Sequence, residues 1–187
     1  TMVNDARRQC LPTEDVERVI AACPDTEWRL LIALSRFGGL RCPSETLKLR
    51  WSDVDWERNR ITVRSKKTAK QGKPHRQIPI FAKLRPYLEG ARDAAESDAK
   101  YVITRYRDAN VNLRTQLLRI IERAGVQLWP KLFHNLRASR ETELAAEHPI
   151  HVVCAWIGNS AQIAAKHYLQ VTDADFEKAR RATTHET

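Results

Sequence analysis

The sequence predicts a mainly helical domain that carries one small antiparallel β-sheet. Apolar residues such as Trp28, Leu31 and Ile32 recur at helical spacing, which indicates a helix with a buried face. The segment 60–64 instead alternates and is β-branched, which is typical of a strand. At 187 residues the chain is long enough to bury a core of its own.

Local signals predict where the elements begin and end. Thr13 and Asp25 are predicted to be the N-caps of the first two helices, because short polar side chains accept hydrogen bonds from the free amides of a first turn. The glycine pair at 38–39 ends the second helix. Pro43 fits the first turn of a short helix through Leu49. Further helices are expected at 82–95, 111–124, 135–146, 150–157, 161–169 and 173–181, and the partner strand of 60–64 at 77–80.

The charge of the chain indicates a polyanionic partner. The formal net charge is +9 and the sequence pI is about 9.7. From Arg58 to Leu88 there are ten Lys or Arg residues and no Asp or Glu. Because this stretch also has strand character, we expect it to contact phosphates as a basic hairpin. No run of about 18 apolar residues occurs, so we expect no membrane span.

Four residues that suit phosphate chemistry follow one another along the chain. Arg41 stands in Gly-Gly-Leu-Arg, His134 and Arg137 in His-Asn-Leu-Arg, and Tyr168 in His-Tyr-Leu-Gln. Arginine is always charged and binds phosphate through two parallel hydrogen bonds. Arg137 lies three residues after His134, so the two are expected to share a helical face and meet one ligand. A tyrosine that follows such a phosphate-binding set can attack the phosphorus.

The ordered set resembles the catalytic domain of the tyrosine recombinase (phage integrase) family, over about Leu11 to Phe176. The resemblance implies the DNA breaking–rejoining fold and a site-specific recombinase or integrase. Such an enzyme cleaves and rejoins DNA through a 3′-phosphotyrosyl intermediate on Tyr168, without metal, ATP or other cofactor. Residues 1–10 are expected to be a linker and 11–187 the catalytic domain, with the family's N-terminal DNA-binding domain absent.

The resemblance also implies a catalytic lysine on the hairpin. Lys67 in Ser-Lys-Lys-Thr has the matching context and would protonate the departing 5′-oxygen, with Lys66 and Lys70 as alternatives. The side chains expected to bind DNA are those of Arg64, Lys66, Lys70, Lys73 and Arg76.

The chain departs from the family pattern at two positions. Asn159 stands where the family usually has His or Trp, nine residues before the tyrosine. An asparagine keeps a neutral N–H donor for the phosphate but has no acid–base capacity. Glu45 comes four residues after Arg41 rather than the more usual three, and we expect it to orient a neighbouring side chain.

The expected partners are double-stranded DNA and the protein itself. The resemblance implies a monomer alone and a tetramer on paired DNA sites, in the cytoplasm with the nucleoid. The alternative is a DNA-binding module of the same fold whose catalysis is weak or lost, which Asn159 favours. A topoisomerase-like outcome is a third possibility. His148 and His151 lack cysteine or carboxylate partners in sequence, so no metal site is expected.

Overall fold

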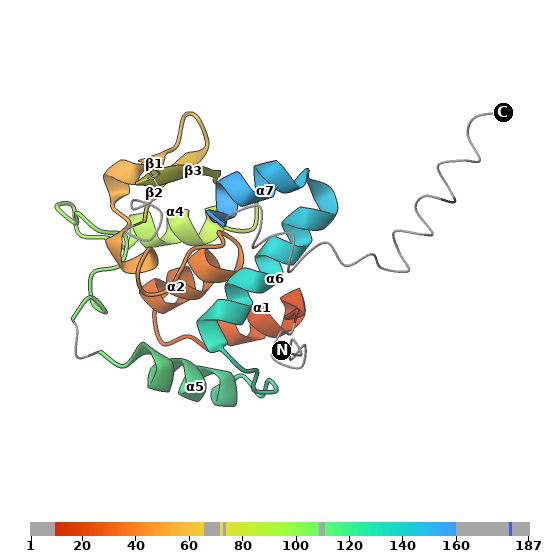
Figure 1. Ribbon diagram of the computed structural model, residues 1–187. Helices are drawn as coiled ribbons and strands as arrows, with labels where there is room; N and C mark the ends of the chain where they lie inside the picture. Colours follow the sequence, from red (N-terminus) through yellow and green to blue (C-terminus); the bar gives the residue numbers. More distant parts are fainter. Residues whose placement is uncertain (1–9, 66–71, 73, 109–110, 160–179, 181–187) are drawn as a thin grey trace.

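Helix α2 (Thr26–Arg36) lies at the centre of the molecule. In the computed structural model shown in Figure 1, α1 (Thr13–Ala21), α4 (Arg85–Asp93) and α6 (Leu132–Glu147) all pack against it. The structure describes residues 10–65, 72, 74–108, 111–159 and 180. The other elements are α5 (Leu113–Arg123), α7 (Ile150–Ile157), the 3₁₀ turns η2 (Thr46–Lys48) and η3 (Trp51–Asp53), and the strands β1 (Val54–Asp55), β2 (Arg60–Arg64) and β3 (His75–Pro79).

The central position of α2 follows from its side chains. Asp25 caps the helix as predicted, because its Oδ1 accepts a hydrogen bond from the Trp28 backbone N–H at 2.8 Å. Trp28 and every residue from Leu30 to Arg36 are buried. A helix that is apolar on nearly all sides must be surrounded by other elements. Each large apolar side chain buried here contributes about 1.5–3 kcal/mol.

A buried charge ties α2 to two neighbouring helices. The Arg36 guanidinium donates to both carboxylate oxygens of Glu143 on α6, and also to the Leu11 carbonyl at 3.2 Å. The same guanidinium lies 3.4 Å from the Thr13 hydroxyl. Thr13 is therefore the first residue of α1 and not its predicted N-cap, a position that Pro12 occupies without a side-chain hydrogen bond. The prediction was wrong because the Thr13 hydroxyl accepts a hydrogen bond from Arg36 instead of from a backbone N–H of the first turn.

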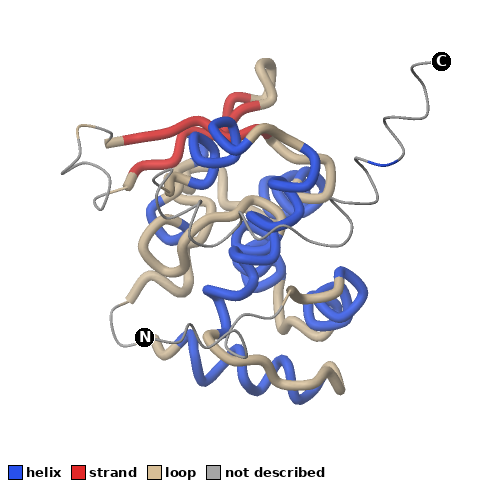
Figure 2. The backbone as a smooth tube through the Cα atoms, turned by 45° about the vertical axis from the view of Figure 1, so that its right-hand side comes forward, coloured by secondary structure: helices blue, strands red, loops and turns tan. Residues whose placement is uncertain are grey.

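The three strands form one antiparallel sheet in the order β1-β2-β3. Ile61 of β2 pairs with Ile78 of β3, and both face the core, whereas Arg60 and Arg64 face outward. Figure 2 shows the strands gathered at one end of the molecule. Helix α7 packs against both β3 and α6, so it closes the space between the sheet and the helical core.

Most predicted elements are present, with shifted ends. The predicted helix 150–157 and strand 60–64 coincide with α7 and β2. Helix α6 begins at Leu132 instead of 135, which places His134 inside the helix. The helix expected from Pro43 to Leu49 is a series of turns that ends in η2, and the short strand β1 was not predicted. The helix predicted at 161–169 lies outside the described residues, and only residue 180 of the one predicted at 173–181 is described.

Within the described ranges, no helix is both long and apolar enough to cross a membrane. The cysteines in those ranges are all unpaired, and burial raises the pKa of Cys23 and Cys42 to about 12. Their thiols therefore stay protonated at neutral pH and are poor nucleophiles.

The turn that leads from α2 to Arg41 requires a glycine. Gly39 has a φ of +67°, and a Cβ at this residue would lie 2.5 Å from Cδ1 of Ile157 on α7. We expect Gly39→Ala to combine backbone strain of about 1–2 kcal/mol with a clash against α7. Its free energy of unfolding, measured by chemical denaturation, should fall by more than the strain alone.

Two other glycines provide the controls. Gly125 also has a positive φ, +63°, but open space around it, so Gly125→Ala should show strain without a clash. Gly90 lies in α4 with open space around it, and Gly90→Ala should stabilise the protein by about 0.5–1 kcal/mol. Equal losses for Gly39→Ala and Gly125→Ala would contradict the packing of Gly39 against α7.

Candidate functional site

Arg41 enters the site from the loop that follows α2. The Leu40 N–H donates to the Leu34 carbonyl at 3.0 Å, which closes the end of the helix, and the Leu40 side chain is fully buried. The next side chain, Arg41, then turns toward α7 and stays 20% exposed. Its guanidinium donates to the Gly158 carbonyl at 2.9 Å and to the Asn159 Oδ1 at 3.3 Å.

The Glu45 carboxylate is the centre of the site. It accepts hydrogen bonds from the Arg41 backbone N–H at 2.9 Å and from the Arg41 guanidinium at 2.6 Å. Arg76 of β3 donates to both of its oxygens at 2.8 Å each. Arg137 of α6 lies 3.9 Å away. The carboxylate therefore holds together arginines from three separate segments, and its side chain is 1% exposed.

The arginines keep this buried carboxylate charged. Burial alone raises the pKa of Glu45, but the hydrogen bonds and charge of Arg76, and then those of Arg41, outweigh it and lower the pKa from 4.5 to about 2. Glu45 is thus ionised at any pH near neutrality. Glu45 was expected to orient a neighbouring side chain, and it binds Arg41 and lies close to Arg137, the two arginines of the motif.

Arg137 is the most enclosed of the three cations. It donates to the Gly39 carbonyl at 2.5 Å and to the Ile157 carbonyl at 2.8 Å, so it joins the end of α2 to the end of α7. It also donates to the Asn159 Oδ1 at 3.1 Å. Burial, and then the charge of Arg41, lower its pKa to about 9. The guanidinium therefore remains charged at neutral pH.

Asn159 connects the two motif arginines to a second carboxylate. Its Oδ1 accepts from Arg41 and Arg137, while its Nδ2 donates to Glu141 Oε1 at 2.5 Å. Glu141 lies on α6 and is buried. It was not predicted as a site residue. The available signal was its position four residues after Arg137, because side chains at this spacing meet on a helix.

Two of the predicted DNA-binding residues already have carboxylate partners. Arg64 donates to Asp53 Oδ2 at 2.5 Å, although its side chain remains 51% exposed. Arg76 is only 9% exposed and donates to the Trp156 carbonyl at 2.6 Å as well as to Glu45. Arg76 was predicted to bind DNA from the hairpin surface, whereas its side chain lies inside the site. No local pattern in the sequence indicated that Arg76 would pair with Glu45.

The structure brings together Arg41, Glu45, Arg137 and Asn159 from the predicted set. His134 stands one helical turn before Arg137 on α6, and it is exposed where Arg137 is buried. The predicted residues that lie outside the described part of the chain are Lys66, Lys67, Lys70, Lys73 and Tyr168.

The network can hold an anion at its open side. The site holds three arginines and two carboxylates, Glu45 beside the arginines and Glu141 behind Asn159, which leaves one positive charge in excess. Planar guanidinium groups held rigidly in this way suit the paired non-bridging oxygens of a phosphate ester, because each group can donate two parallel N–H bonds. Arg41, at 20% exposure, is the most accessible of the three. Within the described ranges, no three His, Cys, Asp or Glu side chains are grouped to hold a metal ion.

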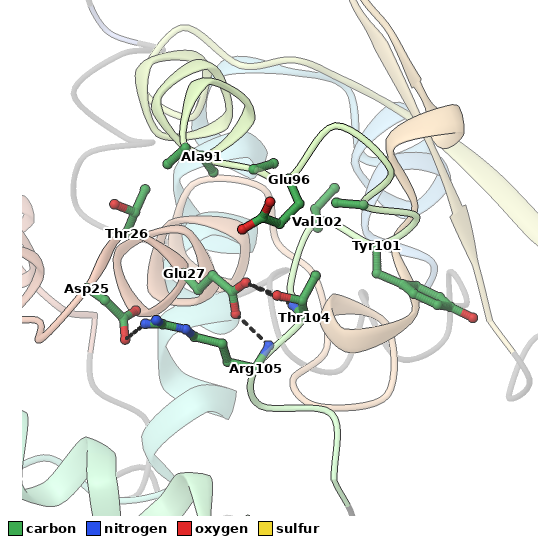
Figure 3. A pocket seen from close by; sticks show the side chains of 12 residues that line it. Asp25, Thr26, Glu27, Ala91, Glu96, Tyr101, Val102, Thr104 and Arg105 are labelled. Carbon is green, nitrogen blue, oxygen red and sulfur yellow. Dashed lines mark hydrogen bonds and ion pairs between the residues drawn. The ribbon is translucent and has the colours of Figure 1, made fainter.

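A separate pocket of about 290 Å³ lies between the start of α2 and the loop after α4. Two of its carboxylates already have partners. Glu27 accepts from the backbone N–H groups of Thr104 at 3.0 Å and Arg105 at 2.9 Å, as Figure 3 shows. Asp25 caps α2 and lies 3.6 Å from the Arg105 guanidinium. These contacts of Glu27 and Asp25 attach the loop to the start of α2.

The fold is that of tyrosine recombinase catalytic domains. The crystal structure of XerA recombinase matches with a TM-score of 0.70 and 21% identity, over 96% of this chain and 64% of that one. The catalytic domain of bacteriophage HP1 integrase matches with a TM-score of 0.64 and 21% identity, over 93% and 94%. The Tn1549 transposon integrase, in complex with transposon right end DNA, matches with a TM-score of 0.76 and 16% identity, over 98% and 68%.

The chain belongs to the phage integrase family, whose pattern it matches over residues 9–175. It is 32% identical to the tyrosine recombinase XerA of Thermococcus kodakarensis over 181 residues, and 30% identical to that of Thermococcus onnurineus over 178 residues. The alignments cover 92% and 91% of this chain, but 61% of each relative. The chain thus spans about three fifths of the length of the curated relatives it matches.

The buried Glu45 carboxylate should dominate the stability of the site. Glu45→Gln leaves its arginines without their counter-charge, and we expect the free energy of unfolding at pH 7 to fall by about 3–5 kcal/mol. In the parent, this stabilisation should be complete above pH 4.5 and lost as the pH falls toward 2, because the folded-state pKa lies below the unfolded one. Chemical denaturation at a series of pH values measures both effects.

The gap between the parent and Glu45→Gln should therefore narrow below pH 4.5. Glu122→Gln on the exposed side of α5 is the matched control and should change neither the stability nor its pH dependence. A gap that stays constant down to pH 2.5 would show that Glu45 is not held ionised by the arginines.

Proposed function

We propose that this domain breaks and rejoins DNA at specific sites through a 3′-phosphotyrosyl intermediate on Tyr168. The observation that carries the proposal is the rigid pairing of Arg41 and Arg137 around the Glu45 carboxylate. Their membership of one network, in a chain of the phage integrase family, supports their assignment to one scissile phosphate.

The arginines would stabilise the negative charge that makes a phosphodiester difficult to attack. A phosphodiester repels nucleophiles, and its transition state gains negative charge on the non-bridging oxygens. Arg41 and Arg137 would stabilise that charge, and because Glu45 and the backbone carbonyls already orient them, little reorganisation is needed. The bond from phosphorus to the Tyr168 oxygen forms as the bond to the 5′-oxygen breaks. The phosphodiester energy is kept in the new linkage, so rejoining needs neither ATP nor metal.

The proton transfers would be carried out by the other predicted residues, His134 and Lys67. A tyrosine has a pKa of about 10, so its phenol needs nearby cations or a base, and His134 is the candidate for the base. Lys67 would protonate the departing 5′-oxygen, with Lys66 and Lys70 as alternatives for the same role. Double-stranded DNA is the proposed substrate, bound by a protein that is monomeric alone and tetrameric on paired sites.

A second candidate function is DNA binding with weak or lost catalysis. The orientation of the Asn159 amide favours it, because the oxygen points toward the two arginines and an N–H points toward Glu141. In this orientation the oxygen of Asn159, and not an N–H, faces the groups that would bind the phosphate. We propose that Asn159 aligns Arg41 and Arg137, and that Glu141 sets the orientation of the amide.

Tyr168→Phe separates chemistry from binding. The change removes only the hydroxyl, so we expect the fold and DNA affinity to persist while the covalent protein–DNA adduct on a nicked suicide duplex disappears. Arg137→Lys keeps the charge but loses the paired donors. It should slow adduct formation on the order of 10²–10³-fold and also weaken binding. Adduct yield over time, compared with the parent, measures the rate for both variants, and titration of the intact duplex measures their affinity.

An adduct that persists in Tyr168→Phe would rule out Tyr168 as the nucleophile. The search would then move to Tyr101, because Tyr87 stacks on Phe37 and Tyr106 donates its hydroxyl hydrogen to Asp25. A parent that binds the duplex and forms no adduct would instead favour the second candidate function.

The pair Glu141 and Asn159 can be tested by a double-mutant cycle on the same duplex. Asn159→Ala and Glu141→Ala should each slow adduct formation. If Glu141 acts through the amide, the double variant should be no slower than Asn159→Ala alone. Glu143→Gln, two residues further along α6 and paired with Arg36 and Arg140, is the control and should change stability without changing the rate.

Additive losses in the cycle would show that Glu141 acts on Arg137 by its charge and not through Asn159. Asn159→His places an imidazole donor beside Glu141 and should keep or raise the rate. Adduct in Asn159→His, with none in the parent, would mean that catalysis was lost at this one position.

A further inference from the structure

Three cations surround the ring of Tyr101 on the surface of the molecule. The Arg107 guanidinium carbon lies 3.3 Å from the ring centroid, so the two planar groups are in contact. The Arg50 guanidinium carbon and the Lys100 ammonium lie 5.7 and 5.9 Å from the same centroid. The Tyr101 ring is therefore the common neighbour of three positive side chains.

The backbone fixes this cluster. Arg50 and Tyr101 form an isolated antiparallel bridge, and the N–H groups of Trp51 and Val102 donate across it at 3.2 and 3.1 Å. Arg107 donates to the Leu47 carbonyl in η2. Because η2 follows Glu45 directly, the cluster is built on the same segment as the arginine network.

The charges acting on Tyr101 are positive. Desolvation opposes the effect, but Arg107, Arg50 and Lys100 together lower the pKa of the Tyr101 hydroxyl. The neighbouring carboxylate of Asp53 is 3% exposed and accepts from Arg64 at 2.5 Å, so it already has a cation. Three like charges gathered around one ring repel one another, and an anion between them would relieve the repulsion.

Tyr101 lines one side of the acidic pocket of the same loop, but its ring points away from the pocket's acidic residues on α2 and just before it. Figure 3 shows the Tyr101 ring directed away from Asp25 and Glu27, with its hydroxyl at the far end. Arg64 stands at the end of β2, from which the basic hairpin continues. Through Asp53, whose carboxylate also accepts from the Arg50 backbone N–H, the hairpin and the cluster adjoin.

We propose that Arg50, Lys100, Tyr101 and Arg107 form a binding site for a DNA backbone phosphate other than the one that is cleaved. A phosphate accepts from guanidinium, ammonium and phenol donors together, and a backbone contact fixes the position of the duplex without reading its sequence. The identity of the polyanion rests on the proposed function. The contact would hold the duplex through η2 and thereby in register with the arginine network.

The salt dependence of binding tests this site. If about five to eight cations of the parent engage phosphates, log K for a short duplex should fall against log salt with a slope of roughly −5 to −7. Arg107→Ala and Lys100→Ala should each make the slope shallower by about 1. Each should weaken binding on the order of 10-fold at 0.1 M salt. Arg18→Ala, an exposed arginine paired with Asp15 on α1, is the control and should change neither quantity.

A duplex with single neutral methylphosphonate linkages then locates the contact. One linkage position should weaken the parent yet leave Lys100→Ala almost unaffected, because the contact is already lost in that variant. This position should differ from the scissile phosphate. Thermal unfolding of Lys100→Ala, whose side chain is exposed, checks that the variant is folded.

The outcomes separate the two proposals. Unchanged slopes in both variants, with a parent that binds normally, would overturn the phosphate site and leave the recombinase proposal standing. Shallower slopes in both variants, together with a parent that forms no covalent adduct, would support the phosphate site and overturn the recombinase proposal. A flat salt response in the parent would overturn both.

Discussion

The candidate site depends on one buried carboxylate. Three arginines that come from the end of α2, from β3 and from α6 would repel one another at these separations in a medium of low dielectric constant. Glu45 makes their convergence possible, since it binds two of them directly and lies 3.9 Å from the third. The carboxylate is ionised because of the arginines, and the arginines are ordered because of the carboxylate. Neither half of the arrangement is stable without the other.

The surrounding fold supplies the rigidity that this balance needs. The end of α2 and the end of α7 are joined through Arg137, which donates to backbone carbonyls of both. Carbonyls held by tertiary packing move less than side chains, so they fix the guanidinium plane. The close approach of Gly39 to Ile157 brings these two helix ends near enough for one side chain to reach both.

The sequence could predict most of the elements and could single out Arg41 and Arg137, which the structure brings together, but it could not predict their contacts. The alternation at 60–64 and the cap at Asp25 are local signals, and β2 and α2 follow them. Thr13 was misplaced because a hydrogen bond from Arg36, distant in sequence, competes for its hydroxyl. Arg76 reads as one more cation of a basic stretch, and only the pairing of β3 with β2 turns it toward Glu45. Long-range packing decided both positions.

The place of Arg76 on β3 has a consequence for how such domains can vary. The register of the strand is set by Ile78 opposite Ile61 in the core, two residues beyond Arg76. Arg76 lies between this pair and the connection from β2 to β3, and it is itself paired with the buried Val63. Residues can therefore be added to or removed from the connection without displacing the arginine. The domain can therefore acquire a new loop at this place while the arginine network around Glu45 stays the same. The tip of the hairpin could therefore be exchanged by design without changing the paired strands that carry it.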